Sequence, residues 1–325
     1  MRRLPSVSFV AGLALLAAPL VAQAQTYPAK PIRMIVGFPP GGGTDVVARI
    51  LGPKLSESLG QQVVIENRSG ATGTVAAGFV AKAPPDGYTI MMGHVAVNSI
   101  APSLFAKVPY DTEKDFAPIT LTASVPHLIT VHPSLPARTL KEMIAFVKAR
   151  PGKLSFPSTG NGSTPHLAGE VFKSVTGIDL LHVPYKGSGQ STADLIAGFH
   201  MVAFDTMPSV SPYVRSGRQR LLAVTSKERQ KEFPNTPTAA ESGAPGYYMT
   251  TWYGLFAPAG TPQAIVERLH AETAKVMQSP DTAKLLAQVG ADGTVTRTPA
   301  EFGAIVRADY ERYAKIIKAT GLRID

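Results

Sequence analysis

The sequence predicts an α/β protein made of two similar units, joined by a hinge, with a ligand cleft between them. Short apolar segments with strand character alternate with segments whose apolar residues recur at helical spacing. This alternation starts near residue 31 and starts again near residue 117. In each unit a glycine-rich loop stands between a strand and a following helix. Strands joined by helical crossovers run parallel, so we expect a parallel sheet in the first unit.

The first unit begins with an apolar strand at residues 31–38 and a helix at 44–59. One face of this helix is apolar and consists of Val47, Ile50, Leu51, Leu55 and Leu59. Pro53 lies within the pattern, so the helix is expected to kink or to divide there. The remaining elements follow in the order strand, helix, strand, at residues 62–67, 75–83 and 88–94.

The second unit opens with a β-rich stretch at residues 117–134, which we expect Pro126 to break. A helix from Thr139 ends at Pro151-Gly152. A strand and a glycine-rich loop fill residues 153–166. The elements predicted after that loop are a helix at 167–177, a strand at 179–187, a helix at 191–199, and strands at 200–206 and 220–226.

The C-terminal part returns to the first unit. Residues 250–260 read as a strand, and residues 261–290 and 298–321 read as helices that each open with Thr-Pro. A chain that leaves one unit, builds another and returns crosses twice, so we expect a hinge near Ser124 and Thr225. The predicted divisions are a signal peptide at 1–24, lobe 1 at 25–124, lobe 2 at 125–225, and a return segment at 226–325 whose helices pack on lobe 1.

The N-terminal 24 residues have the features of a secretory signal peptide. Arg2 and Arg3 precede an apolar segment, and Ala22-Gln23-Ala24 forms a small-x-small site, which predicts cleavage after Ala24. No later stretch reaches the roughly 18 apolar residues of a membrane-spanning helix. The sequence also lacks cysteine, which excludes disulfides, thiol nucleophiles, thiolate metal sites and an anchor on an N-terminal cysteine. We therefore expect a soluble protein of the bacterial periplasm.

The composition favours a folded protein that does not bind nucleic acid. Of 325 residues, 44% are hydrophobic and 17% are charged, which argues against disorder. The formal charge is +9, or +7 without Arg2 and Arg3, and such a balance favours anionic partners. The basic residues are scattered singly, however, without the stripe that nucleic-acid binding needs.

The loops at residues 39–45 and 158–166 are placed to bind an anion, because each precedes a helix N-terminus with unpaired N–H groups. Neither loop contains Lys or Arg, which excludes a phosphate-binding Walker loop. Gly41 and Gly43 do not complete a dinucleotide motif, because Val46 stands where a third glycine is required. No nucleotide and no other cofactor is therefore expected.

Catalytic and metal-binding interpretations are weaker. A hydrolase could use Ser163 with His166, although G-x-S-x-G is absent; alternatively, Ser163 or Thr164 caps a helix. Asp45 could stabilise the helix N-terminus, or it could order water or bind a ligand ammonium group. Tyr185 and Asp205 are either pocket walls or a packed ring and a strand-end acid. The other histidines show no metal-ligand spacing, so no metal site is expected; they are His94, His127, His132, His182, His200 and His270.

Several long motifs carry a resemblance to a known family. They are PIRMIVGFPPGGGTD, VVIENRSGATGT, AKAPPDGYTIMMG, HVPYKGSG, RLLAVTSKER, FPNTPTAAESGAPGY and WYGLFAPAGTP. In order and spacing they resemble the Bug family, the extracytoplasmic solute receptors of tripartite tricarboxylate transporters. The resemblance implies a type II-like periplasmic-binding-protein fold whose two α/β lobes close on a small ligand, mostly an organic carboxylate. It also implies that the chain is no enzyme, acts as a monomer, and has the transporter's membrane subunits as partners. The alternatives are an exported hydrolase that uses Ser163 and His166, and a receptor that feeds a membrane sensor.

The resemblance further implies ligand contacts through backbone groups and ordered waters in loops of both lobes. The residues implied are Pro39, Pro40, Gly41, Gly42, Thr44 and Asp45 in the first loop, His94 after the third strand, and, in the second lobe, Thr159, Gly160, Asn161, Gly162, Ser163, Thr164, His166, Tyr185 and Asp205. Two departures from the family pattern are Pro53 within the first helix and Met201 where an acidic residue is common.

Overall fold

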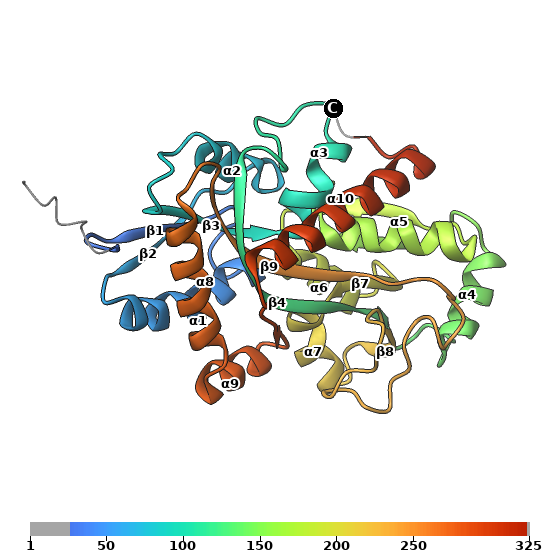
Figure 1. The fold of residues 1–325 in the computed structure, drawn as a ribbon. Helices are drawn as coiled ribbons and strands as arrows, with labels where there is room; N and C mark the ends of the chain where they lie inside the picture. The colour runs from blue at the N-terminus through green and yellow to red at the C-terminus, as the bar shows by residue number, and fades with distance from the viewer. Residues whose placement is uncertain (1–26, 324–325) are drawn as a thin grey trace, which may run out of the picture.

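One long strand, β4 (Phe116–Val131), joins the two portions of sheet in the computed structural model, which describes residues 27–323 (Figure 1). Residues 116–126 of β4 pair antiparallel with β9 (Thr250–Pro258). Residues 127–131 pair antiparallel with β7 (Val202–Thr206) and β8 (Arg220–Val224). The expected break at Pro126 is wrong. The proline pairs opposite Thr250, at the last rung with β9, and the strand continues with new partners.

The first unit has the predicted parallel sheet. Strands β1 (Ile32–Val36), β2 (Val63–Asn67) and β3 (Thr89–His94) are arranged in the order β2-β1-β3, and β3 then pairs antiparallel with β9. Helices cover both faces. Met34 and Val36 belong to the apolar cluster of α1 (Gly43–Leu59), whereas Ile35 belongs to that of α2 (Thr74–Ala81).

Pro53 does not divide α1, which runs unbroken from Gly43 to Leu59. Leu51 and Leu55 flank the proline and are both buried against the sheet. Packing of that buried face therefore maintains the helix despite the hydrogen bond that proline cannot donate.

The second portion of sheet is only partly parallel. Strands β5 (Ser155–Ser158) and β6 (Leu181–Pro184) form a parallel pair, but β7 and β8 run antiparallel to β4. The helices of this portion are α4 (Leu140–Lys148), α5 (Thr164–Thr176), α6 (Ser188–Ile196) and α7 (Met207–Arg215). The sequence pattern did not predict α7, which contains two prolines. Short elements complete the order: η1 (Ala71–Gly73), η2 (Ala96–Ile100), α3 (Ala101–Leu104) and β10 (Asp292–Gly293).

The expected helix over 261–290 is two helices, α8 (Gln263–Met277) and α9 (Pro280–Gln288). The Ser279 side chain accepts a hydrogen bond from the Thr282 N–H and caps α9, and Pro280 begins the new helix. Thr261 does not cap α8; its hydroxyl donates to the Pro258 carbonyl instead. Thr298 does cap the last helix, α10 (Pro299–Thr320), as predicted.

None of the helices in residues 27–323 is long and apolar enough to cross a bilayer. The predicted signal peptide at residues 1–24 and its cleavage after Ala24 lie outside the described residues.

Helix α8 packs against α1 and β4, and α10 crosses β4 and reaches η2 and α5 (Figure 1).

Two glycines let aromatic rings lie directly on the central strands. A Cβ on Gly254 would stand 2.2 Å from the Phe302 ring of α10, and a Cβ on Gly93 would stand 2.3 Å from the Phe256 ring. Gly93 and Gly254 pair across β3 and β9, and the rings of Phe256 and Phe302 lie 4.9 Å apart. The approach of α10 to the sheet therefore depends on the absence of a side chain at Gly254.

We expect Gly254→Ala to lower the free energy of unfolding by about 1–3 kcal/mol, because the new methyl group overpacks the Phe302 ring. Gly303→Ala is the matched control: it lies inside α10, where the nearest atom to a new Cβ is Pro118 at 3.4 Å, and alanine favours a helix interior. Urea denaturation of both variants measures the difference. Equal stabilities would contradict the prediction.

Candidate ligand-binding site

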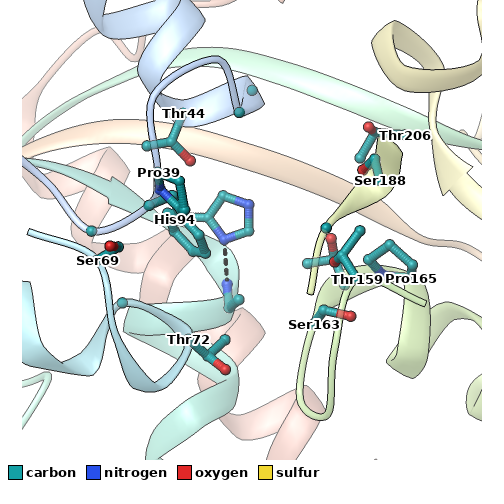
Figure 2. Close-up of a pocket in the computed structure, with 18 of the residues that line it drawn as sticks. Pro39, Thr44, Ser69, Thr72, His94, Thr159, Ser163, Pro165, Ser188 and Thr206 are labelled. Atoms are coloured by element: carbon teal, nitrogen blue, oxygen red, sulfur yellow. Dashed lines mark hydrogen bonds between the residues drawn. The ribbon is translucent and has the colours of Figure 1, made fainter. Parts of the chain in front are cut away.

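A cleft of about 510 Å³ lies where the loops after β1, β2 and β3 face those after β5, β6 and β7 (Figure 2). Ligands of open α/β sheets bind at this carboxyl edge of the strands. The lining also includes the ends of β3 and β7, the first turns of α1, α5, α6 and α7, and one residue of β9. The lining residues are Gly37–Thr44, Ser69–Gly73, His94, Ala96, Thr159, Ser163–Pro165, Lys186–Gly189, Asp205, Thr206, Ser209 and Tyr253.

Five helices begin at this cleft. Their N-cap residues, all in its lining, are Gly42 of α1, Gly73 of α2, Ser163 of α5, Gly187 of α6 and Thr206 of α7. Of the five, only Ser163 provides a side-chain cap, by accepting from the His166 N–H. A helix N-terminus has unpaired N–H groups and a partial positive charge, so their convergence favours an anion in the cleft.

The first predicted loop lines the cleft through Pro39, Pro40, Gly41, Gly42 and Thr44. A Cβ on the neighbouring Gly43 would stand 2.4 Å from the Tyr253 hydroxyl, so this glycine lets β9 approach the first turn of α1. Among residues 27–323, the Tyr253 hydroxyl has no hydrogen-bond partner. It is therefore available to a ligand.

Asp45 does not line the cleft. Its buried carboxylate turns under the loop and accepts hydrogen bonds from the Gly41 N–H (2.9 Å), the Arg49 Nε (2.8 Å) and the Asn67 Nδ2 (2.8 Å). Burial alone would raise the pKa of Asp45, but these hydrogen bonds and the Arg49 charge lower it below its ordinary value. Asp45 thus braces the loop and ties α1 to β2.

His94 lies at the end of β3, its ring between Phe38 and Tyr253, and faces the cleft (Figure 2). Its Nδ1 accepts a hydrogen bond from the Ala96 N–H at 3.0 Å, so the ring proton is on Nε2. Burial, together with the charge of His127, lowers the pKa of His94 to about 3. His94 is therefore a neutral N–H donor for a ligand.

The second predicted loop divides into two groups. Thr159, Ser163 and Thr164 line the cleft, while Gly160, Asn161, Gly162 and His166 lie outside the lining. Loops of the two sides meet where the Thr72 hydroxyl donates to the Asn161 carbonyl at 3.3 Å.

Ser163 and His166 do not form a catalytic pair. The His166 Nδ1 accepts from the Gly162 N–H at 3.1 Å, and its ring stacks on His182 at 3.8 Å. The contact between Ser163 and His166 is the helix cap, which uses the backbone N–H of His166. Burial lowers the pKa of His166 to about 3. The imidazole therefore acts as a fixed acceptor for the loop backbone.

Of the remaining predicted residues, Asp205 lines the cleft and Tyr185 does not. The Tyr185 hydroxyl donates to Asp194 at 2.6 Å and contacts the His200 Nε2 at 2.7 Å, which fixes the start of the loop that carries Lys186. Asp205 is buried at the end of β7, and burial raises its pKa to about 6.

Sequence reasoning missed several lining residues. The loop Ser69–Gly73 has four successive positive φ values, at Gly70, Ala71, Thr72 and Gly73. Its signal was available, because SGATGT precedes a helix as the two predicted loops do. Lys186, exposed and free of ion pairs among the described residues, also lines the cleft. Tyr253 comes from the far end of the chain and gave no local signal. Met201, the predicted departure, lies outside the lining.

A metal centre has no support in the part of the chain that the structure describes. No three His, Asp or Glu side chains of residues 27–323 gather closely enough to hold an ion.

Comparisons with known proteins match most of the chain. The sequence model of the family described as "Tripartite tricarboxylate transporter family receptor" matches residues 47–322. Protein BugT of Bordetella pertussis is 37% identical over 95% of this chain and 94% of its own length. The solved structure of R. palustris Rpa4515 with adipate has a TM-score of 0.85 and 36% identity, covering 91% of this chain and 99% of that one. MatC from Rhodopseudomonas palustris with bound malate has a TM-score of 0.81 and 32% identity, covering 90% and 100%.

We expect Asp45→Asn to lower the free energy of unfolding at pH 7 by about 1–3 kcal/mol, because an amide offers one oxygen to the three donors that the buried carboxylate now satisfies. The hydrogen bonds that lower the pKa of Asp45 stabilise the fold above the unfolded-state pKa of about 3.9, and this stabilisation is lost as the pH falls. The gap between wild type and variant should therefore narrow from pH 7 toward pH 3.

Urea denaturation across that pH range measures the gap. Asp281→Asn is the matched control, because the exposed Asp281 carboxylate on α9 pairs, within residues 27–323, only with Lys54. Loss of this surface ion pair should change the free energy of unfolding much less than Asp45→Asn does. A gap for Asp45→Asn that remains constant with pH would show that the carboxylate is not the brace.

Proposed function

This chain belongs to the tripartite tricarboxylate transporter receptor family, and on that premise we propose that it is a periplasmic receptor for a small organic carboxylate. It captures the acid and delivers it to the membrane subunits of a tripartite tricarboxylate-type transporter. The observation that carries the proposal is the convergence of five helix N-termini on one cleft. The family match and the similarity to BugT confirm the predicted Bug-family resemblance.

In this proposal, uncharged hydrogen-bond donors make most of the contacts that hold the ligand. The cleft offers first-turn backbone N–H groups, the His94 Nε2–H and the hydroxyls of Thr44, Thr159 and Tyr253. Hydrogen bonds to a charged acceptor are stronger than neutral ones, so such donors hold a carboxylate without an ion pair. The cleft volume of about 510 Å³ suits a small molecule. Two of the solved relatives are complexes with adipate and with malate, which supports a dicarboxylate.

We propose that residues 25–124 with 226–325, and residues 125–225, form two lobes that close over the ligand. The partner change along β4 after Pro126 supports a hinge near Ser124. At the second crossing, the buried Thr225 hydroxyl contacts the backbone of His127 and Met249, which ties the three passing segments together. The hydrogen bond between Thr72 and Asn161 supports the proposal that loops of the two lobes meet when the cleft closes.

Export is the remaining part of the proposal. Arg2, Arg3 and the apolar segment that follows support cleavage after Ala24, which leaves a mature chain beginning at Gln25. Intact-mass analysis of the exported protein measures that terminus.

We expect one or a few acids in a panel of small mono-, di- and tricarboxylates to raise the melting temperature of the protein. A ligand at about 100 times its dissociation constant adds about 2.7 kcal/mol when only the folded state binds it. Thermal shift identifies the acid, and chromatography of the same sample after prolonged incubation measures its consumption. The acid should remain intact. Consumption of the acid would favour the alternative function of a hydrolase. If no acid raised the melting temperature, the proposed receptor function would be contradicted.

Gly42→Val should abolish binding of that acid while the protein stays folded. A Cβ at Gly42 meets only the Pro39 carbonyl at 3.4 Å and the backbone φ is −73°, so valine fits the fold and projects into the cleft. Calorimetry measures binding, and small-angle scattering should show contraction of the wild type with ligand and none of the variant. Gly303→Ala, outside the cleft, is the control. Normal binding by Gly42→Val would place the ligand elsewhere.

A further inference from the structure

A small chamber lies behind the wall that Asp205 forms in the cleft. Its volume is about 10 Å³, which is close to the space that one water molecule occupies. Residues of β5, α6, β7 and α7 line it together with Gln219, which directly precedes β8, and all of them are buried. Its polar lining residues are Ser191, Thr192, Asp205 and Gln219. A chamber with this many polar groups suits water rather than an apolar group.

Gln219 brings an unused donor to this chamber. The side chain is 1% exposed, and its Oε1 accepts a hydrogen bond from the Thr130 hydroxyl at 2.8 Å. Its Nε2 has no hydrogen-bond partner among the described residues. Buried polar groups are nearly always paired, with protein or with ordered water, because an unpaired donor costs free energy. The Gln219 amide therefore points to a partner in the chamber.

Asp205 is the acceptor that the chamber shares with the cleft. The residue is 7% exposed and lines both spaces. Oδ1 accepts from the Thr206 N–H at 2.7 Å and lies 3.5 Å from the Thr206 hydroxyl. A carboxylate has about four lone-pair positions on its two oxygens. The Thr206 N–H and the Ser188 hydroxyl use two of them. Asp205 can therefore accept one further hydrogen bond from the chamber and one from the cleft.

We propose that the chamber binds one structural water, which accepts from the Gln219 Nε2–H and donates to the Asp205 carboxylate. Gln219 is then a positioning residue for the ligand site. Acting through the water, it stabilises Asp205 in its ionised form, so the cleft wall presents a strong hydrogen-bond acceptor. For the receptor proposed above, and resting on that function, this acceptor favours acids that also carry a hydroxyl or ammonium donor.

The titration of Asp205 reports on this water. Burial raises the pKa of Asp205 to about 6, while hydrogen bonds from Thr206 and Ser188 oppose the rise. A further donor to the ionised form holds the pKa down, so loss of the water raises it. The titratable groups that line the cleft with Asp205 are Tyr253 of β9, His94 of β3 and Lys186 before α6. His127 of β4 pairs opposite Thr206, so its side chain lies on the other face of the sheet.

The first experiment follows the Asp205 carboxyl carbon by NMR against pH in the unliganded protein. We expect Gln219→Leu to raise its midpoint by about one pH unit, which is a tenfold increase in proton affinity. Thr251→Val is the matched control, because the Thr251 hydroxyl is also buried without a partner in the described chain but lies outside both spaces. Equal midpoints in wild type and Gln219→Leu would overturn the proposal, as would the same rise in Thr251→Val.

The second experiment needs no variant and stands if Gln219→Leu does not fold. A high-resolution crystal structure of the wild type should show one water within hydrogen-bond distance of both the Gln219 Nε2 and the Asp205 carboxylate. The Gln219 side-chain amide protons should also show a nuclear Overhauser effect to water. An amide that instead bonds directly to a protein group, with no density in the chamber, would overturn the proposal.

The third experiment compares malate with succinate, which differ by one hydroxyl group. The wild type should bind malate about tenfold more tightly, and Asp205→Asn should bring the two dissociation constants close together. Equal binding of both acids by the wild type would overturn the ligand preference. If the wild type bound neither these acids nor any other carboxylate, the receptor function would fail, while the carboxyl titration would still decide the water site.

Discussion

β4 carries the hydrogen bonds that fix the two sides of the cleft relative to each other. Its first part pairs with β9, which in turn pairs with β3 of the parallel sheet, and its last five residues pair with β7 and β8. His94 at the end of β3 and Asp205 at the end of β7 are therefore held by one continuous ladder. The loops need little contact with each other to face a common space, because the strands beneath them already bring their ends together.

The chemistry of the cleft follows from what stands at those strand ends. Parallel strands followed by helices leave helix N-termini along one edge, and here four of five lack a side-chain cap. Asp45 is the acid nearest the first loop, but its carboxylate does not repel an anion in the cleft. It is already hydrogen-bonded to the loop backbone, to Arg49 and to Asn67. The positive character of the cleft therefore comes mainly from backbone dipoles, with Lys186 as an exposed cation at the lining.

Buried neutral histidines stabilise the backbone around the cleft. His94 and His166 each accept a hydrogen bond at Nδ1 from a nearby main-chain N–H, of Ala96 and of Gly162. Burial keeps both rings uncharged down to about pH 3, so this support persists across the range in which a free histidine would titrate. For His166, this role explains how a serine and a histidine can lie close in sequence without forming a catalytic pair.

The sequence by itself determined the local elements and the two glycine loops. The spacing of hydrophobic residues predicted β1, α1, β2 and β3. Thr298 predicted the start of the last helix. The long motifs were sufficient to indicate the family. Only the tertiary structure decided which side chains face the cleft and where the prolines interrupt an element. Three predicted residues lie outside the cleft lining, namely Asp45, His166 and Tyr185. Two residues of other segments, Ser69 and Tyr253, belong to the lining instead. Gln219 is hydrogen-bonded to Thr130, which lies 89 positions earlier in the chain. Helix α1 stays continuous through Pro53 because its buried face is packed. Periodicity and capping are local signals, while side-chain direction and long-range partners are set by packing between distant segments, which no local pattern encodes.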